Sequence, residues 1–262
     1  MRSVQSSFLI LGLSLLTASA HGASVTSVPV PFAWKGADFR GYLAMPADDG
    51  EARPAILIVH DWMGPRGYFE EMARKIAGWG YAAYVADVYG TDTRPANAQE
   101  AAHEAGRLRG GDRSELRARA GKNLEILRAR DGVDPSRVIA IGFCFGGTTV
   151  LEMARAGIDL TGVVSFHGNL ESPRPATREG SVKPAVLVLH GDSDPYVPEG
   201  EVQDFQDEMR KVRADWEMVK FGGAVHSFTD PAADSPGARY DASAARRSWA
   251  VFRDFCEELF DR

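Results

Sequence analysis

A run of apolar residues that ends in glycines around one cysteine constrains this chain more than any other segment. The run is Ile139-Ala140-Ile141, and it leads into Gly142-Phe143-Cys144-Phe145-Gly146-Gly147. Branched apolar residues predict a buried strand, and a helical pattern follows the glycines at once. A side chain presented on such a tight turn needs small residues two positions before and after it, as Gly142 and Gly146 are. The pattern is typical of a nucleophile elbow, with cysteine in the place of serine.

The chemistry of this turn favours a reactive thiol at Cys144. A helix that begins near Gly146 would direct the positive end of its dipole at the sulfur and stabilise the thiolate, which is the nucleophilic form. A glycine-rich turn before a helix can instead bind phosphate, but the Lys-Ser/Thr of a P-loop is missing here. A third interpretation makes Cys144 a small buried apolar residue. The segments downstream favour the catalytic interpretation.

Two later loops supply the partners that a nucleophile needs. The apolar run 185–190 predicts a buried strand, and the turn-rich segment 191–198 that follows it contains Asp194. The run 216–221 predicts another strand, and His226 lies in the loop after it. Nucleophile, acid and histidine occur in this order in α/β-hydrolases, each on a loop after a separate strand. Cys144, Asp194 and His226 are therefore the predicted catalytic residues.

Length and composition indicate one large α/β domain, which we expect over residues 24–262. The chain has 262 residues, of which 44% are hydrophobic and 25% are charged, as is usual for a globular protein with a sizeable core. We find no linker rich in proline and serine that would divide it. A formal net charge of −6 and the lack of a basic stripe argue against a nucleic-acid partner.

The first 20 residues have the pattern of a signal peptide. Arg2 supplies a positive charge, residues 8–16 are apolar, and Ala18-Ser19-Ala20 fits a cleavage site with small residues. The apolar core is too short to span a bilayer, although a retained anchor is the alternative. We therefore expect export to the periplasm or the medium, a mature protein that starts near His21, and no membrane insertion after cleavage.

The two cysteines, Cys144 and Cys256, are too few for a disulfide framework. Cys256 lies in the amphipathic segment 249–260, which predicts a terminal helix, and its expected role is packing. A bridge between the two cysteines is possible in an oxidising compartment. It would consume the predicted nucleophile, however, so none is expected.

The remaining patterns predict the other elements of a mostly parallel sheet. The alternating segment 25–45 predicts an N-terminal antiparallel hairpin around residues 35–38. Strands that alternate with helical segments predict a parallel sheet with helices on both faces. Ligands bind at the carboxyl ends of such strands, where the predicted catalytic residues lie. Further strands are expected at 55–60, 81–88 and 163–166, helices at 68–78, 114–129 and 202–212, and a turn at 134–137.

The same residues show that the chain resembles the dienelactone hydrolase family, the cysteine members of the α/β-hydrolase fold. The segment 142–147 matches the family's elbow. Asp194, in Gly191-x-x-Asp194-x-x-Val197-Pro198, matches its acid, and His226, within 223–229, matches its base. Residues 164–168 and 240–260 are similar to one broad subgroup of the family. The resemblance covers essentially everything after the predicted signal peptide.

The resemblance implies that the chain hydrolyses an ester or lactone through an acyl-cysteine. His226 would take the thiol proton or pair with the thiolate, and Asp194 would orient the imidazole. Cys144 would attack the carbonyl carbon, and water would later release the acyl group from the thioester. The oxyanion hole would consist of the backbone N–H of Phe145 and, by the family match, that of Trp62.

Two positions depart from the family pattern. Asp61 stands where the family usually has a glutamate that contacts the resting cysteine, so it is a possible resting-state acid with a shorter reach. Asp230 stands four residues after the histidine, where the best-known members have an arginine that holds a substrate carboxylate. Because a carboxylate at this position would repel an anion, small neutral substrates are expected. One arginine of the variable segment could reach the site, but exposed helix surfaces are the expected location of Arg94, Arg107, Arg109 and Arg113.

The histidines at strand ends are interpreted as structural. His60 and His190 are expected to hydrogen-bond neighbouring loops, whereas His167 could line the pocket. Tyr89, like Trp62, is a possible pocket wall or a core residue. No His-x-x-x-His or Cys-x-x-Cys spacing supports a metal site, and no cofactor is expected.

Three functions remain open from the sequence. The intact triad favours a hydrolase that acts on small esters or lactones. An exported, non-catalytic ligand-binding protein on the same scaffold and a thiol-dependent acyltransferase are the alternatives. A catalytic Cys144 should be alkylated rapidly near neutral pH, whereas a buried structural thiol should be inert. In each case the expected partner is a small molecule, and a monomer is favoured.

Overall fold

The computed structural model describes residues 24–47 and 50–261 of the chain. The predicted signal peptide, residues 1–20, and the expected mature start at His21 lie outside the described residues. Within the described ranges, no helix combines the length and the apolar character needed to cross a membrane.

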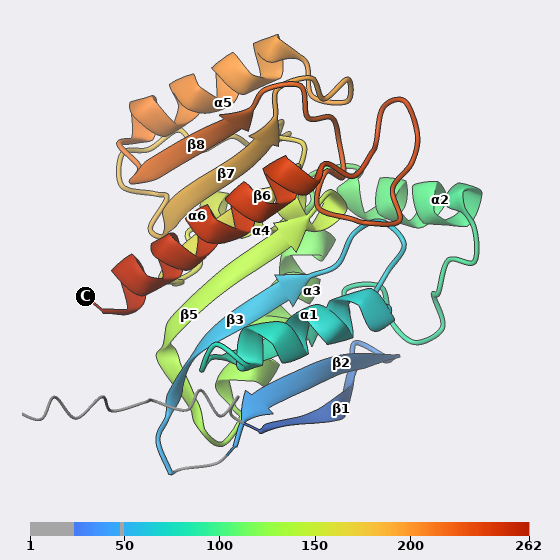
Figure 1. Ribbon diagram of the computed structural model, residues 1–262, viewed down its shortest axis with the longest axis vertical. Helices are drawn as coiled ribbons and strands as arrows, with labels where there is room; N and C mark the ends of the chain where they lie inside the picture. Colours follow the sequence, from blue (N-terminus) through green and yellow to red (C-terminus); the bar gives the residue numbers. More distant parts are fainter. Residues whose placement is uncertain (1–23, 48–49, 262) are drawn as a thin grey trace, which may run out of the picture.

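One mixed sheet forms the middle layer of the described part of the chain (Figure 1). Its strands are β1 (Val25–Trp34), β2 (Ala37–Pro46), β3 (Arg53–Val59), β4 (Ala82–Ala86), β5 (Val133–Phe143), β6 (Gly162–Phe166), β7 (Ala185–Gly191) and β8 (Trp216–Phe221). They lie in the order β1-β2-β4-β3-β5-β6-β7-β8. The pairs β1–β2 and β2–β4 are antiparallel, and all the other pairs are parallel. The predicted hairpin and the predicted parallel sheet are therefore confirmed.

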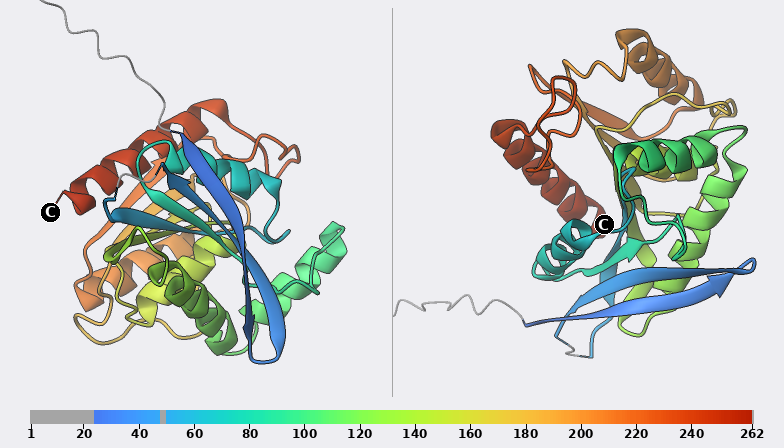
Figure 2. Two further views of the ribbon diagram at one scale, coloured as in Figure 1. Left: turned by 90° about the horizontal axis from the view of Figure 1, so that it is seen from below. Right: turned by 90° about the vertical axis from the view of Figure 1, so that its right-hand side faces the viewer.

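Helices cover both faces of the sheet, as the right-hand view of Figure 2 shows. They are α1 (Gly67–Ala77), α2 (Ala98–Arg109), α3 (Ser114–Arg128), α4 (Phe145–Arg155), α5 (Glu199–Val212) and α6 (Ala242–Phe260). α1 and α6 pack on one face, and the other four helices pack on the opposite face. This three-layer arrangement is the predicted α/β-hydrolase fold.

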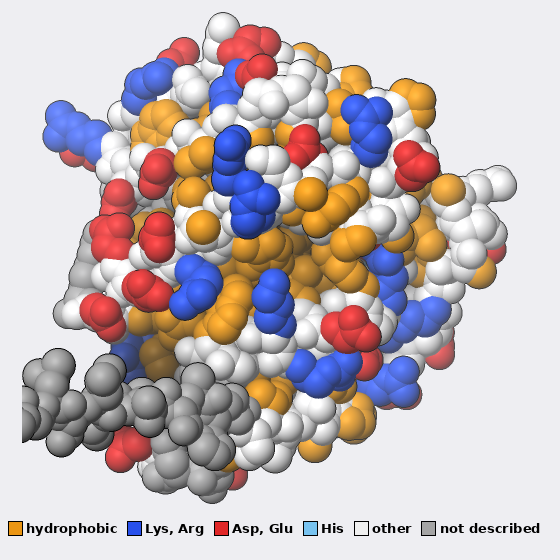
Figure 3. Space-filling view, viewed as in Figure 1, with side chains coloured by type: hydrophobic (Ala, Val, Ile, Leu, Met, Phe, Trp, Pro, Cys, Tyr) orange, Lys and Arg blue, Asp and Glu red, His pale blue; other side chains and the backbone are white. Residues whose placement is uncertain are grey.

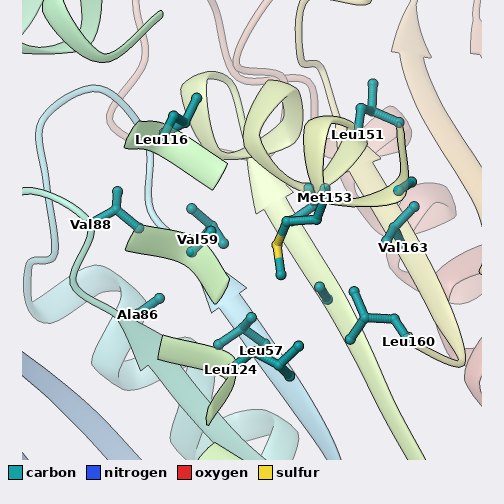
Figure 4. Packing of buried hydrophobic residues seen from close by; sticks show 14 of the residues in the cluster. Leu57, Val59, Ala86, Val88, Leu116, Leu124, Leu151, Met153, Leu160 and Val163 are labelled. Atoms are coloured by element: carbon teal, nitrogen blue, oxygen red, sulfur yellow. The ribbon is translucent and has the colours of Figure 1, made fainter. Parts of the chain in front are cut away.

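Alternate residues of the central strands fill the two cores. In β3, Leu57 and Val59 lie in the cluster with α3 and α4, where Leu151 packs (Figure 4). Ile56 and Ile58 lie in the cluster on the other face, against α1. Successive side chains of a strand point to opposite faces, so a strand buried on both faces is apolar throughout. The apolar runs therefore mark the strands that position the site.

Two details differ from the sequence-based expectation. The predicted turn at 134–137 lies inside β5, where the pairing with β3 moves from Val133 directly to Val138. Asp134 Oδ1 accepts a hydrogen bond from the Ser136 N–H at 2.9 Å, so this stretch is a local bulge within the strand. α2 was not among the predicted elements.

Both cysteines are free. Cys256 is fully buried in α6, and burial raises the pKa of its thiol. Its expected packing role is confirmed, and a buried thiol with a raised pKa is chemically inert.

Candidate active site

Cys144 lies on a strained turn between β5 and α4. Its backbone has φ 54° and ψ −112°, a region that residues other than glycine seldom occupy. A Cβ added to Gly142 would lie 2.0 Å from the carbonyl oxygen of Gly146. One added to Gly146 would lie 2.2 Å from the carbonyl oxygen of Val59. Both distances are far inside van der Waals contact, so the two glycines have the role that the elbow pattern predicts.

Aromatic packing supports the elbow from behind. Phe143, the residue before Cys144, stacks on Phe166 with ring centroids 4.6 Å apart. Trp249 of α6 contacts both rings, at 6.1 Å and 5.3 Å. The Cys144 N–H donates to the Phe166 carbonyl at 3.0 Å, which ties the turn to β6. The side chain of Cys144 itself is partly exposed, as a nucleophile must be.

His226 and Asp194 form a buried hydrogen-bonded pair on the loops after β8 and β7. Nδ1 of His226 lies 2.8 Å from Asp194 Oδ2, and both residues are largely shielded from solvent. The other carboxylate oxygen, Oδ1, accepts from the Tyr196 N–H at 2.9 Å. The backbone of His226 is held in turn by hydrogen bonds with Gly237 and Arg239. The imidazole orientation is therefore fixed.

The electrostatics of this pair favour a charged histidine. Burial alone would lower the pKa of His226, but the negative charge of Cys144 and hydrogen bonds with Asp194 and Cys144 raise it to about 10. At neutral pH this histidine therefore carries a proton and lies beside the sulfur of Cys144. The arrangement can thus deliver a nucleophile and hold a proton for a leaving group.

His167 lies next to His226, with ring centroids 5.2 Å apart. Its Nε2 is 2.9 Å from Thr229 Oγ1, and within the described ranges its buried Nδ1 has no hydrogen-bond partner. Burial and the nearby charge of His226 hold the pKa of His167 well below its ordinary value, so this ring is neutral. Its ring contacts that of His226, and its expected role in lining a pocket stays a prediction.

The other strand-end histidines differ from each other. His60 has the expected hydrogen bonds, with the Asp61 carbonyl and the Val88 N–H. For His190 the expectation fails, because the described part of the chain offers its buried Nδ1 no partner. A loop contact cannot be read from a strand-end position alone, since the loop must also turn toward the ring.

Arg66, which no sequence pattern marks as a site residue, joins two of the candidate residues. Its guanidinium pairs with Asp61 and lies 3.2 Å from Asp230 Oδ2. Asp61 Oδ1 also accepts from the Met63 N–H at 2.9 Å. We call Asp61, Arg66 and Asp230 the Arg66 cluster. Both carboxylate oxygens of Asp61 are thus engaged by residues close to it in the sequence. The expected contact between Asp61 and the resting Cys144 stays a prediction.

The arginines of the variable segment are held in ion pairs. The pairs are Arg94 with Asp87, Arg107 with Glu104, Arg109 with Glu171, and Arg113 with Glu152 and Glu171. The expected exposed helix surface is wrong for Arg113, which is only 5% exposed, and for Arg94, which lies half-buried in the loop before α2. Glu152 of α4 is fully buried and requires positive partners, which Arg113, Arg117 and Arg155 supply.

A groove of about 590 Å³ opens between α1, α6 and the loop after His226. Figure 3 shows apolar side chains on this face with Lys and Arg around them. Met72 and Trp249 are among its apolar lining, and Lys75 and Arg246 are among its basic lining. Thr229, which also lines the groove, is the hydrogen-bond partner of His167, so only this contact connects the groove with the candidate site.

The fold and the position of the elbow define the class. A mostly parallel sheet carries Cys144 after β5, Asp194 after β7 and His226 after β8, so their loops meet at one edge, as in an α/β-hydrolase. The sequence model of the dienelactone hydrolase family matches residues 39–260. The chain belongs to this family, and it is a hydrolase of the carboxylic ester and lactone type.

Relatives of known name agree with this assignment. The chain is 26% identical over 238 residues to a putative carboxymethylenebutenolidase of Salmonella typhimurium, covering 88% of this chain and 85% of the relative. It is 27% identical to a probable 2-oxo-3-(5-oxofuran-2-ylidene)propanoate lactonase of a Bradyrhizobium species, covering 79% and 84%. Among solved structures, a dienelactone hydrolase-like promiscuous phosphotriesterase from metagenomic libraries is 37% identical, with a TM-score of 0.84 and coverage of 91% and 99%.

Proposed function

We propose that this chain hydrolyses small neutral carboxylic esters or lactones through a Cys144–His226–Asp194 triad and an acyl-cysteine intermediate. The observation that carries the proposal is the pairing of a strained, partly exposed Cys144 with a histidine that Asp194 holds at 2.8 Å. That pairing places a nucleophilic sulfur beside a group that can take up a proton and return it to a leaving group.

The reaction has two halves. The Cys144 thiolate adds to the carbonyl carbon, and the carbonyl oxygen becomes an oxyanion that the N–H groups of Phe145 and Trp62 stabilise. The bond to the leaving oxygen then breaks, and His226 gives its proton to that oxygen, which leaves a thioester. In the second half His226 takes a proton from water, the hydroxide attacks the thioester, and the thiolate leaves as the acid product forms.

The preference for neutral substrates rests on the Arg66 cluster. Two carboxylates, those of Asp61 and Asp230, surround one guanidinium, so the cluster has a net charge of −1. Arg66 is thereby already paired and adds no free positive charge for a substrate carboxylate. Like charges near the site disfavour an anionic substrate.

The test is hydrolysis of a short-chain aryl ester at pH 7.5. The wild type should hydrolyse the ester, and iodoacetamide should abolish this activity. Cys144→Ala should be inactive, whereas Cys256→Ala is the matched control, because it removes the other thiol and should keep both turnover and its sensitivity to iodoacetamide. An active Cys144→Ala variant would contradict the proposed nucleophile.

The fate of the acyl group separates hydrolysis from acyl transfer. With an added alcohol or thiol as acceptor, a hydrolase forms mainly the free acid, whereas an acyltransferase forms mainly the new ester or thioester. Product analysis with and without acceptor therefore decides between the two. A preference for the acceptor at millimolar concentration over water would replace hydrolysis with acyl transfer.

Phosphotriester hydrolysis is a second candidate activity. The relative at 37% identity and a TM-score of 0.84 is a promiscuous phosphotriesterase. A neutral phosphotriester offers Cys144 an electrophilic phosphorus atom. Like a neutral ester, it carries no negative charge that the carboxylates of the Arg66 cluster would repel. Turnover of diethyl 4-nitrophenyl phosphate by the wild type, and its loss in Cys144→Ala, would support this activity at the same site.

A further inference from the structure

Buried hydrogen bonds hold the loop that carries Trp62. Nδ1 of His60 lies 2.6 Å from the carbonyl oxygen of Asp61, which also accepts from the Gly64 N–H at 3.2 Å. The carbonyl of Trp62 accepts from the Tyr89 hydroxyl at 2.8 Å. The N–H of Trp62 has no partner within the part of the chain that the structure describes. This N–H is thus free to bind a substrate oxygen.

The contacts of His60 define its tautomer. The Val88 N–H donates to its Nε2 at 3.4 Å, and the Asp61 carbonyl can only accept from its Nδ1. The ring therefore carries its proton on Nδ1 and is neutral. Complete burial, which lowers the pKa of His60, favours the same form.

The ring of His60 also links the two proposed oxyanion donors. It stacks on Phe145 with ring centroids 6.0 Å apart and an angle of 16° between the planes. Tyr89 completes the cluster, 4.7 Å from His60 and 5.4 Å from Phe145. Phe145 follows the nucleophile, so one buried group of rings joins the loop after β3 to the start of α4.

We propose that His60 is a positioning residue for the oxyanion hole, acting through the peptide group between Asp61 and Trp62. The Asp61 carbonyl and the Trp62 N–H belong to this one rigid group, so holding the oxygen fixes the direction of the N–H. The hydrogen bond from Nδ1 also polarises the group and strengthens Trp62 as a donor. The inference rests on the proposed hydrolase function, because it assigns a role in stabilising its tetrahedral intermediate.

Two amide variants separate the nitrogens of His60. The side chain of Asn in His60→Asn places an N–H where Nδ1 stands and preserves the bond to the Asp61 carbonyl. The longer side chain of His60→Gln places its amide near Nε2 and leaves that carbonyl with only the weaker bond from the Gly64 N–H. His60→Gln should lower kcat for an aryl ester by about a hundredfold, the effect of losing one oxyanion donor, with little change in KM. His60→Asn should recover most of that loss.

The rate at which iodoacetamide alkylates Cys144 separates a positioning role from a merely structural one. A general structural defect would lower this rate, whereas a misplaced oxyanion donor would not. This displacement forms no oxyanion, so its rate should stay within about twofold of the wild type in both variants, because the thiolate and His226 are untouched. Equal kcat losses in the two variants, an unchanged kcat in His60→Gln, or a matching loss of alkylation would each overturn the inference.

Tyr89→Phe keeps the test decisive if His60→Gln does not fold. It removes only the hydroxyl that holds the Trp62 carbonyl and should lower kcat by about tenfold with alkylation unchanged. An unchanged kcat would contradict the role of this loop.

Cys144→Ala distinguishes the two proposals. If it retains hydrolysis, the proposed function fails, whereas an inactive Cys144→Ala beside a fully active His60→Gln sinks only the present inference.

Discussion

The elbow and the Arg66 cluster lie at the same edge of the sheet but are stabilised in different ways. At the elbow, backbone atoms approach so closely that Gly142 and Gly146 have no substitute. In the Arg66 cluster, charged groups meet at a half-exposed position, with the Arg66 side chain 35% exposed, where solvent and salt weaken them. Steric fit therefore fixes the turn that carries Cys144, whereas the cluster that we propose to disfavour anionic substrates is held only by weak and easily altered charges.

The largest effect is expected from breaking the elbow. Gly146→Ala forces a Cβ into the Val59 carbonyl and should lower the free energy of unfolding by about 4 kcal/mol or more, with loss of activity. Gly121→Ala, in α3 with open space around it, is the control and should raise that free energy by about 0.5–1 kcal/mol. Urea unfolding measures both. A mild effect of Gly146→Ala would mean that the close approach is not what fixes Cys144.

A large loss of activity is expected when the histidine loses its acid. Asp194→Asn removes the charge that holds the His226 imidazolium and should lower kcat/KM by about a thousandfold or more. Asp192→Asn, on the same loop, disturbs only an exposed pair with Lys220 and should change kcat/KM by less than about twofold. Similar values for the two variants would remove Asp194 from the triad.

The raised pKa of His226 should make the free energy of unfolding depend on pH. His226 has its pKa raised from 6.5 to about 10 in the folded state, although burial opposes this, so protonation favours folding. The stabilisation is complete below pH 6.5 and is lost as the pH rises toward about 10. The difference in unfolding free energy between the wild type and His226→Gln should therefore narrow over this range. A difference that widens with pH would have the wrong sign.

The smallest effect is expected in the Arg66 cluster. Asp230→Asn leaves Arg66 with one carboxylate and should shift the ratio of kcat/KM for a carboxylated ester over a neutral ester by about threefold to fivefold. The shift should fade in 0.5 M salt, where the Debye length is only about 4 Å. Asp234→Asn, on the same loop, is the control and should leave the ratio unchanged. A shift that salt does not reduce would point to a changed shape instead of a changed charge.

The fold and the positions of the three candidate catalytic residues at strand ends could be predicted because their causes are local. Apolar runs mark strands that are buried on both faces. The spacing of Gly142, Cys144 and Gly146 predicts the tight turn between strand and helix. Asp194 and His226 could be recognised because each follows such a run. These patterns need no knowledge of distant contacts.

Other features depend on residues far apart in the sequence. Arg66 meets Asp230 across 164 positions, so no spacing reveals the cluster. Arg113 is buried because Glu152 on α4 needs a partner, which the charge of Arg113 alone does not show. In α2, small and charged residues such as Ala101, Ala105 and Glu104 form the buried side together with Leu108, so the usual apolar stripe of a helix is weak.

The aromatic support of the elbow by α6 has a consequence for the timing of synthesis. Phe143 and Phe166 pack on Trp249, which a ribosome reaches long after the cysteine itself. During synthesis from the N-terminus, Cys144 is therefore made before the ring of Trp249 that packs behind it and before His226. The surroundings of the proposed nucleophile are thus completed among the last features of the molecule, so an incomplete chain would lack a competent Cys144.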